Sequence, residues 1–259
     1  MTNEEIYAVA LKQAALELNC TVGDLTGSTN KVFVASENEG ARKYYKYPIE
    51  LNIVSYGNCA VASVSERLRP AVEKYLSAYN FVHCFETPNM LVLDDFLRER
   101  GLRLCFMAHY FLPDVNLLKE RGCGFEVKIL RPCDFKNLYT EEWSNALCVE
   151  RKSLDVLAVG AYDGNKLVGL AGCSADCEDM WQIGVDVLPE YRRRGIASAL
   201  TVKLALEILK RGKVPFYCAA WSNVKSERNA IKSGFRPAWV ELTAKSAEHV
   251  DGMNKNIRL

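Results

Sequence analysis

One stretch in the last third of the chain combines a strand, a tight turn, clustered arginines and the start of a helix. It reads WQIGVDVLPEYRRRGIASAL and runs from Trp181 to Leu200. We expect the strand to end at Pro189 and the helix to begin near Gly195. The first N–H groups of a helix have no acceptor within the helix, and the helix dipole adds positive potential there. The stretch is therefore predicted to bind an anion such as a phosphate group.

The side chains around this turn suit the same chemistry. Gly195 lets a ligand approach the backbone without a Cβ in the way, and Ala197 keeps the next inward position small. Arg192, Arg193 and Arg194 place cations beside the site. Arginine runs are more often a solvated face, and R-x-x-G-x-A alone is a weak motif. The order of strand, proline, turn and helix is what gives the motif its weight here.

A second polar element follows the next predicted strand. Asn223 is followed by Ser226 one helical turn later, and then by Gly234 and Phe235. With these residues the chain resembles the GNAT superfamily of N-acetyltransferases. The family pattern V-x-P-x-Y-R-x-x-G-x-G/A reads VLPEYRRRGIA here, from Val187 to Ala197. The resemblance covers residues 125–259, and the whole chain resembles a bacterial subfamily that carries its own N-terminal domain.

The resemblance implies that acetyl-CoA is the co-substrate and that an amine of a small molecule or peptide accepts the acetyl group. In the family, the strand before the turn splays from its neighbour and pairs with pantetheine, while the turn binds the pyrophosphate. The Val187 N–H matches a donor to the thioester carbonyl. By matching the family motif, the resemblance implies that the following residues bind the cofactor: Val185, Asp186, Val187, Arg192, Arg193, Arg194, Gly195, Ile196, Ala197, Ser198, Asn223 and Ser226.

One position departs from the family pattern. The family often places a tyrosine seven residues after the asparagine to protonate the departing thiolate, and this chain has Ala230 there. An alkyl thiol has a pKa of about 8.5, so an acid helps the thiolate to leave but is not indispensable. Tyr217, Tyr191, Ser222 or a bound water could take the role.

Amine attack also requires a base, because a primary ammonium with a pKa of about 10 is not nucleophilic. The acidic residues considered are Glu141, Glu142, Asp176, Glu178 and Asp186. Each of them is more often a surface charge, a turn residue or a helix cap, so the catalytic residues stay unassigned.

Two other functions remain open at this point. The missing tyrosine would also suit a catalytically inactive sensor or regulatory module that binds acyl-CoA. A protein or peptide N-terminal acetyltransferase is a further alternative, and a hydroxyl or thiol acceptor is not excluded. For the enzyme we expect direct transfer in a ternary complex, because no cysteine has an evident histidine partner.

The elements that must position these residues follow from hydrophobic periodicity and turn signals. In the second half we expect strands at 125–130, 154–163, 165–175, 181–188, 214–221 and 235–244. Helical segments are expected up to about residue 153, and helices at 195–211 and 224–233. This order predicts a GNAT-type mixed sheet flanked by helices.

The first half reads as a second, α+β domain. We expect helices at 3–18, 66–79 and 89–100, and strands at 31–35, 51–56, 60–64, 81–85 and 103–112. Gly57-Asn58 suits a hairpin between two of these strands. The fold class is therefore α/β (α+β), with domains at 1–124 and 125–259. The role of the first domain and the oligomeric state stay open.

Composition limits the class of protein. The 259 residues are 49% hydrophobic and 25% charged, which fits a globular protein. The net charge of +1 gives no strong positive potential that would attract nucleic acid or an anionic membrane. The acidic start MTNEEIY is unlike a secretory signal, and no stretch approaches the roughly 20 apolar residues of a membrane span. We expect a cytoplasmic protein. Ten cysteines without a CxxC pair, and three histidines, predict buried reduced thiols and no metal site.

Overall fold

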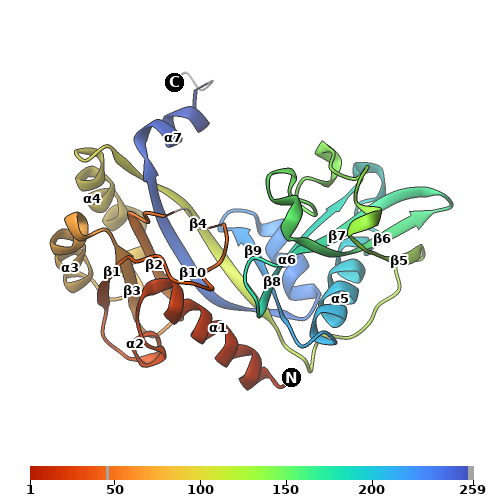
Figure 1. Cartoon of the computed structure of the whole chain (residues 1–259), viewed down its shortest axis with the longest axis horizontal. Coiled ribbons are helices and arrows are strands. Elements are labelled where there is room, and N and C mark those ends of the chain that lie inside the picture. The colour runs from red at the N-terminus through yellow and green to blue at the C-terminus, as the bar shows by residue number, and fades with distance from the viewer. Residues whose placement is uncertain (45–46, 256–259) are drawn as a thin grey trace. The chain divides into compact units, whose positions relative to one another are not determined.

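The computed structural model describes residues 1–44 and 47–255, and this part of the chain forms two compact units (Figure 1). The first unit contains residues 1–10 and 110–237, and the second contains residues 11–109 and 238–259. Three elements have residues in both units: α1 (Asn3–Leu18), β4 (Leu102–Pro113) and β10 (Phe235–Ser246). The division into domains 1–124 and 125–259 stays a prediction.

The first unit is built on a mixed sheet, as the sequence predicts. The strands are β5 (Glu126–Leu130), β6 (Asp155–Asp163), β7 (Lys166–Ser174), β8 (Met180–Val187) and β9 (Val214–Ala220). Neighbouring strands from β5 to β8 are antiparallel, whereas β8 and β9 are parallel. The end of β4 at residues 110–113 follows β9 in the strand order. This arrangement confirms the expected α/β class.

Helices α5 (Ile196–Leu209) and α6 (Val224–Lys232) supply the helical layer of the first unit. The i, i+4 series Ile196, Leu200, Leu204 and Ile208 is at most 1% exposed, which makes one face of α5 fully apolar. These side chains join residues of β6, β7, β8 and β9 in one core. Gly212 has a φ of +72° and follows the end of α5.

The helical segments expected up to about residue 153 are present only as short 3₁₀ helices, without an α-helix. The structure has only short 3₁₀ turns there: η3 (Pro132–Asp134), η4 (Glu141–Trp143) and η5 (Val149–Leu154). Polar side chains in this segment bond to the backbone, which competes with continuous helix. The Asp134 carboxylate, for example, accepts a hydrogen bond from the Arg131 N–H at 2.8 Å. Phe135, Trp143 and Leu147 nevertheless anchor the segment in a second apolar cluster.

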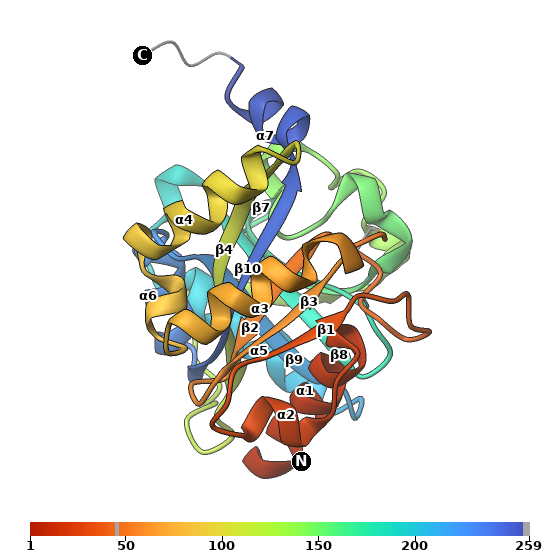
Figure 2. The ribbon, with the colours of Figure 1, turned by 90° about the vertical axis from the view of Figure 1, so that its left-hand side faces the viewer.

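The sheet of the second unit has the strand order β1-β3-β2-β10-β4. It contains β1 (Lys31–Val34), β2 (Leu51–Ser55) and β3 (Ala60–Val64), and β2 and β3 form the expected antiparallel hairpin. Gly57 in that hairpin has a φ of +96°, which explains the glycine. Figure 2 shows α3 (Arg69–Ala78) and α4 (Thr87–Arg98) lying across one face of these strands, where they enclose an apolar core. The turn η1 (Glu66–Leu68) leads into α3.

Local capping explains where the first half differs from expectation. The predicted strand 81–85 is wrong, because the Asn80 side chain accepts the His83 N–H at 3.0 Å and starts the 3₁₀ turn η2 (His83–Phe85). Two short helices were not expected. A reciprocal pair of hydrogen bonds between Thr21 and Asp24 begins α2 (Val22–Thr26), and Ser246 caps α7 (Ala247–Met253).

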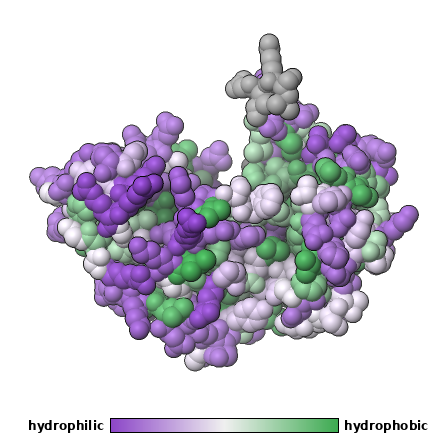
Figure 3. Space-filling view, turned by 180° about the vertical axis from the view of Figure 1, so that it is seen from behind, coloured by the Kyte–Doolittle hydropathy of each residue, from purple (hydrophilic) through white to green (hydrophobic). Residues whose placement is uncertain are grey.

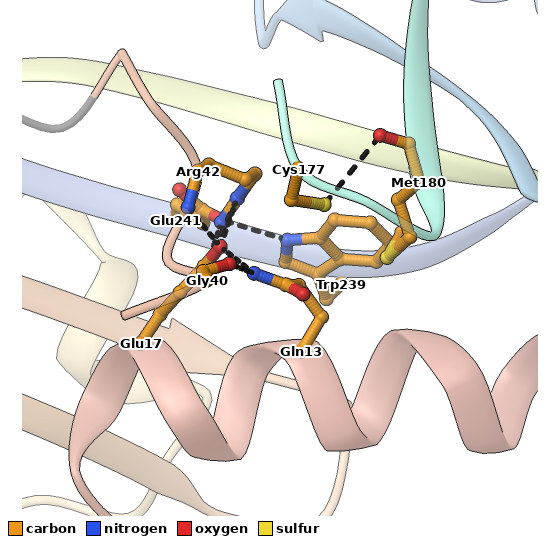
Figure 4. A network of polar contacts seen from close by, with 8 residues as sticks. All are labelled: Gln13, Glu17, Gly40, Arg42, Cys177, Met180, Trp239 and Glu241. Atoms are coloured by element: carbon orange, nitrogen blue, oxygen red, sulfur yellow. Dashed lines mark hydrogen bonds and ion pairs between the residues drawn. The ribbon is translucent and has the colours of Figure 1, made fainter. Parts of the chain in front are cut away.

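A buried ionic network ties three segments of the second unit together (Figure 4). The guanidinium of Arg42 donates to Glu17 of α1 at 2.6–2.8 Å and to Glu241 of β10 at 2.6 Å. All three side chains are at most 4% exposed. Gln13 Nε2 also donates to Glu17, and Trp239 Nε1 to Glu241. Two buried carboxylates therefore share one guanidinium.

The surface seen in Figure 3 is mostly hydrophilic, with hydrophobic residues in scattered groups. Within residues 1–44 and 47–255, no helix is both long enough and apolar enough to cross a membrane.

Candidate functional site

The parallel pairing of β8 with β9 stops part-way along both strands. The paired residues run from Met180 with Val214 to Ile183 with Tyr217. Beyond that pair, Gly184–Val187 still pairs with β7, but the described residues offer these positions no partner on the β9 side. The two strands therefore part at Ile183 and Tyr217. This is the splay that the resemblance implied for the strand before the turn.

Backbone direction on β8 decides which groups face the opening. The Leu188 N–H donates to the Val168 carbonyl, toward β7, at 3.1 Å. Because backbone groups alternate between the two edges of a strand, Asp186 also faces β7, while Val185 and Val187 face the opening. Two of the three predicted pantetheine-pairing residues therefore present their backbone N–H groups to the open edge.

The N-terminus of α5 lies beside this opening. An ideal Cβ at Gly169, which pairs with Val187, would lie 2.6 Å from Cγ2 of Ile196, so the missing side chain lets the helix start rest directly on β7. The first hydrogen bond of the helix runs from the Ala199 N–H to the Gly195 carbonyl at 3.1 Å. Across residues 193–198, no backbone N–H has an acceptor within the described part of the chain.

The turn before α5 has the shape of an anion nest. Arg193 and Gly195 have φ values of +64° and +82°, and such alternation points successive N–H groups into one concavity. No atom lies within 4 Å of an ideal Cβ at Gly195, so the space beside the turn is open. The predicted residues Gly195, Ile196, Ala197 and Ser198 are brought together here.

The three arginines border the nest as exposed cations. Within the described ranges none of them forms an ion pair with a carboxylate. Arg192 Nε donates to the Val187 carbonyl at 3.0 Å, which ties the turn to the end of β8. The Arg194 guanidinium lies 5.2 Å from the centre of the Tyr191 ring. The Tyr191 hydroxyl donates a hydrogen bond at 3.0 Å to Asp163, the last residue of β6, so that phenol is already engaged.

The second motif lies at the start of α6. The Asn223 side chain caps the helix by accepting the Ser226 N–H at 3.2 Å. The Ser226 hydroxyl shares a hydrogen bond of 2.8 Å with the Tyr217 hydroxyl. Ala230, where the family often has a tyrosine, is fully buried and belongs to the same core as Tyr217. Ser222 is exposed in the turn before the helix.

The acidic candidates for a base have different surroundings. Glu141, Glu142 and Glu178 are exposed. Asp176 is fully buried and accepts from Arg151 Nη1 at 2.5 Å. Asp186 accepts hydrogen bonds at 2.7–2.9 Å from Asn145 and the Ala146 N–H. The first three face solvent, whereas the carboxylates of Asp176 and Asp186 accept hydrogen bonds from other segments.

Sequence reasoning missed the close approach of residues 145–146 to the sheet. Gly172 and Gly184 are paired across β7 and β8. An ideal Cβ built at Gly172 would lie 2.1 Å from the Ala146 carbonyl oxygen. One built at Gly184 would lie 1.8 Å from the Asn145 carbonyl oxygen. Both glycines are therefore required for the backbone of this segment to lie against the strands. The glycines are visible in the sequence, but their partner segment is distant in the chain.

A buried acid also escaped the sequence analysis. Asp155 opens β6, is 4% exposed and accepts the Cys148 N–H at 3.1 Å. Burial raises its pKa to about 6, the charge of Asp176 acts in the same direction, and hydrogen bonds from Cys148 and Tyr139 oppose the shift. Within the described residues, no three His, Cys, Asp or Glu side chains are grouped as metal ligands would be.

Comparison with known proteins identifies the motif-bearing segment. The family model described as GNAT acetyltransferase matches residues 115–238, which include β8, the nest and α6. This segment is therefore similar to GNAT acetyltransferases. The match supports the GNAT fold inferred from the two motifs, and it covers just under half of the chain. A search of curated proteins found no match.

Three solved structures that are described as GNAT proteins have similar chains. A chain from Novosphingobium aromaticivorans, assigned to the GNAT family as an acetyltransferase, is 22% identical with a TM-score of 0.42; the match covers 56% of this chain and 66% of that one, just under two thirds. A GCN5-related N-acetyltransferase-like protein from Streptococcus suis is 22% identical over 62% of this chain and 69% of its own, with a TM-score of 0.45. A GCN5-related N-acetyltransferase from Sphaerobacter thermophilus is 15% identical over 73% and 72%, with a TM-score of 0.46.

Proposed function

We propose that the GNAT segment transfers the acetyl group of acetyl-CoA to the amine of a small molecule or peptide. The observation that carries this proposal is the position of the opened edge of β8, with the Val185 and Val187 N–H groups, beside the N-terminus of α5. A thioester that follows this edge would have its pyrophosphate next to the unpaired N–H groups of residues 193–198.

The chain's own groups suit each part of acetyl-CoA. The nest and the exposed guanidinium groups of Arg192, Arg193 and Arg194 supply donors and positive charge for the phosphates. Val187 offers a backbone N–H to the oxygen on which charge develops when the carbonyl is attacked. We therefore assign binding and polarisation of the thioester to these backbone groups.

The transfer itself is direct. The amine nitrogen forms a bond to the carbonyl carbon and loses a proton to water, and the C–S bond then breaks with its electron pair going to sulfur. The exposed carboxylates of Glu141, Glu142 and Glu178 are the acidic candidates still free to relay that proton. No covalent acetyl-enzyme is required, because the amine and the thioester react while both are bound.

Release of free thiol from acetyl-CoA tests this proposal. Purified full-length protein is mixed with acetyl-CoA and a panel of primary amines that includes hydroxylamine, polyamines and short peptides with free N-termini. We expect amine-dependent thiol release in at least one case, with a product whose mass is increased by one acetyl group. Thiol release that does not depend on the amine would contradict acetyl transfer to an amine.

A catalytically inactive acyl-CoA sensor is the second function considered, because Ala230 places no phenol at the position that the family often uses. The sensor predicts tight binding of acetyl-CoA and no thiol release with any amine. The same assay, combined with a binding measurement, separates the two functions.

A further inference from the structure

Tyr217 occupies the point at which β8 and β9 part. It is the last residue of β9 that pairs with β8, opposite Ile183. Its side chain is 4% exposed and packs in the core that also contains Ile196, the first residue of α5. The ring makes an edge contact with Phe111 at 6.5 Å between ring centres. Tyr217 therefore lies at the inner end of the opening, on the face covered by α5.

The Tyr217 hydroxyl contacts the inner face of α6. It lies 2.8 Å from the Ser226 hydroxyl, and either oxygen can be the donor. Ser226 and Ala230 are four residues apart on α6, so their side chains lie one above the other on the same face of that helix. Because its hydroxyl is hydrogen-bonded to Ser226, the phenol of Tyr217 lies on the side of α6 that also carries the small Ala230 side chain. A tyrosine at position 230 would compete with the Tyr217 ring for that space.

We propose that Tyr217 is the general acid of this chain and that it replaces, from β9, the tyrosine that is missing from α6 at position 230. This inference rests on the proposed acetyl transfer. In this arrangement the Ser226 hydroxyl donates to the Tyr217 oxygen, which leaves the phenolic hydrogen free to point toward the leaving sulfur. Ser226 is then a positioning residue and Tyr217 the catalytic one.

The protons lost and gained in this step balance with water as the only additional reactant. When the tetrahedral intermediate collapses, the C–S electron pair goes to sulfur and the phenolic proton of Tyr217 moves to that sulfur, which gives free thiol. The tyrosinate takes a proton back from water, to which the amine nitrogen has lost one. Thioester and amine are thus converted to amide and thiol with the enzyme unchanged.

The surroundings of the two candidate phenols differ in a way that favours Tyr217. Burial raises the pKa of Tyr217, and its hydrogen bonds to Ser226 and Asn229 act in the opposite direction. The phenol is therefore protonated at neutral pH, as an acid must be. The Tyr191 hydroxyl instead donates a hydrogen bond to Asp163, the last residue of β6.

The decisive variant is Tyr217→Phe, assayed by thiol release from acetyl-CoA with hydroxylamine as the acceptor. We expect kcat to fall by about 10- to 100-fold, the low end for loss of a general acid because a thiolate leaves readily. The KM for acetyl-CoA is expected to stay within about twofold. Tyr75→Phe is the matched control and should keep the wild-type kcat, because Tyr75 is a buried tyrosine of the second unit whose hydroxyl donates to the Cys84 carbonyl at 2.9 Å. Ser226→Ala should lower kcat by about three- to tenfold.

A volume-conserving swap tests the replacement itself. The double variant Tyr217→Ala, Ala230→Tyr moves the phenol from β9 to α6, and we expect it to recover at least about tenfold over Tyr217→Ala alone. A merely structural tyrosine would show a lowered melting temperature with unchanged kcat. That result in Tyr217→Phe, or no gain in a folded swap variant, would overturn the assignment. A wild-type protein that binds acetyl-CoA but releases no thiol would instead overturn the proposed transfer, and the acid with it.

Discussion

The carboxylate of Asp186 accepts two hydrogen bonds from Asn145, at 2.9 Å from its backbone N–H and at 2.7 Å from its side-chain amide. A third comes from the Ala146 N–H at 2.9 Å. Asp186 belongs to the β8 segment that borders the opening, so its side chain anchors residues 145–146 over the sheet while its neighbours Val185 and Val187 face the opened edge. The same three residues of β8 thus connect the segment 145–146 with the proposed cofactor site.

Removal of that carboxylate should loosen the segment. Asp186→Ala leaves the N–H groups of Asn145 and Ala146 without an acceptor, and we expect the free energy of unfolding to fall by about 1–3 kcal/mol in urea titrations. Asp179→Ala is the control, because Asp179 is exposed and its ion pair with Lys213 at 3.3 Å should contribute less than about 1 kcal/mol. Equal stability of the two variants would mean that Asp186 does not anchor the segment.

A methyl group at Gly184 should displace the same segment by steric contact. Its ideal Cβ would lie 1.8 Å from the Asn145 carbonyl oxygen, so the backbone must move. We expect Gly184→Ala to cost about 1–3 kcal/mol of unfolding free energy, as overpacking does elsewhere. Gly122→Ala serves as the comparison, since no atom lies within 4 Å of that position. If both variants keep the wild-type midpoint in urea, residues 145–146 do not rest on the strands.

The network around Arg42 should be the most sensitive ionic site of the second unit. Arg42→Met leaves Glu17 and Glu241 buried without their cation, and loss of one partner of a buried pair costs about 3–5 kcal/mol. Arg67→Met removes an ion pair to Glu50 whose arginine is 50% exposed, and should cost less than about 1 kcal/mol. Chemical unfolding at pH 7 measures both. A similar small loss in the two variants would argue against the buried network.

Asp155 should make stability depend on pH in a window set by its shifted pKa. The folded state holds the proton up to a pH of about 6, whereas the ordinary pKa of the group is 3.8. Ionisation of Asp155 therefore lowers stability above pH 6, and this loss disappears as the pH falls toward 4. Asp155→Asn should be more stable than wild type at pH 8, by about 1–3 kcal/mol, with little difference at pH 4. Melting temperatures of the two proteins across this pH range provide the check.

Regular elements with a clear apolar period were predictable from the sequence. The bounds of α1 agree with the expected helix 3–18, and α5 follows the Ile196 to Ile208 series closely. Short polar segments were not predictable in this way, because their conformation depends on individual side-chain hydrogen bonds. At residues 81–85, where a strand was expected, the hydrogen bond from the His83 N–H to the Asn80 side chain favours a 3₁₀ turn. The segment 131–154 similarly has apolar anchors without a helical period.

In the candidate site, too, local features were predictable and contacts between separate segments were not. The turn and helix start at 192–198 were predictable, because both are local in sequence and glycine marks the left-handed position at Gly195. Contacts between distant segments were not. Neither the approach of Asn145 to Gly184 nor the bond between Tyr217 and Ser226 leaves a pattern within one stretch of sequence. These contacts depend on how a turn segment and a helix pack against the strands, which the periodicity of a single stretch does not determine.

Calorimetric titration measures whether the N-terminus of α5 binds the pyrophosphate of acetyl-CoA, on which the proposed acetyl transfer depends. We expect the wild-type protein to bind acetyl-CoA and CoA in the micromolar range, and Gly195→Glu to bind at least about tenfold more weakly, a loss of 1.4 kcal/mol or more. Gly212→Glu is the matched control: it has a similar φ of +72°, equally open space, and the same added charge beyond the C-terminal end of α5. Unchanged affinity in a folded Gly195→Glu variant, or no binding of either ligand by folded wild-type protein, would contradict the account.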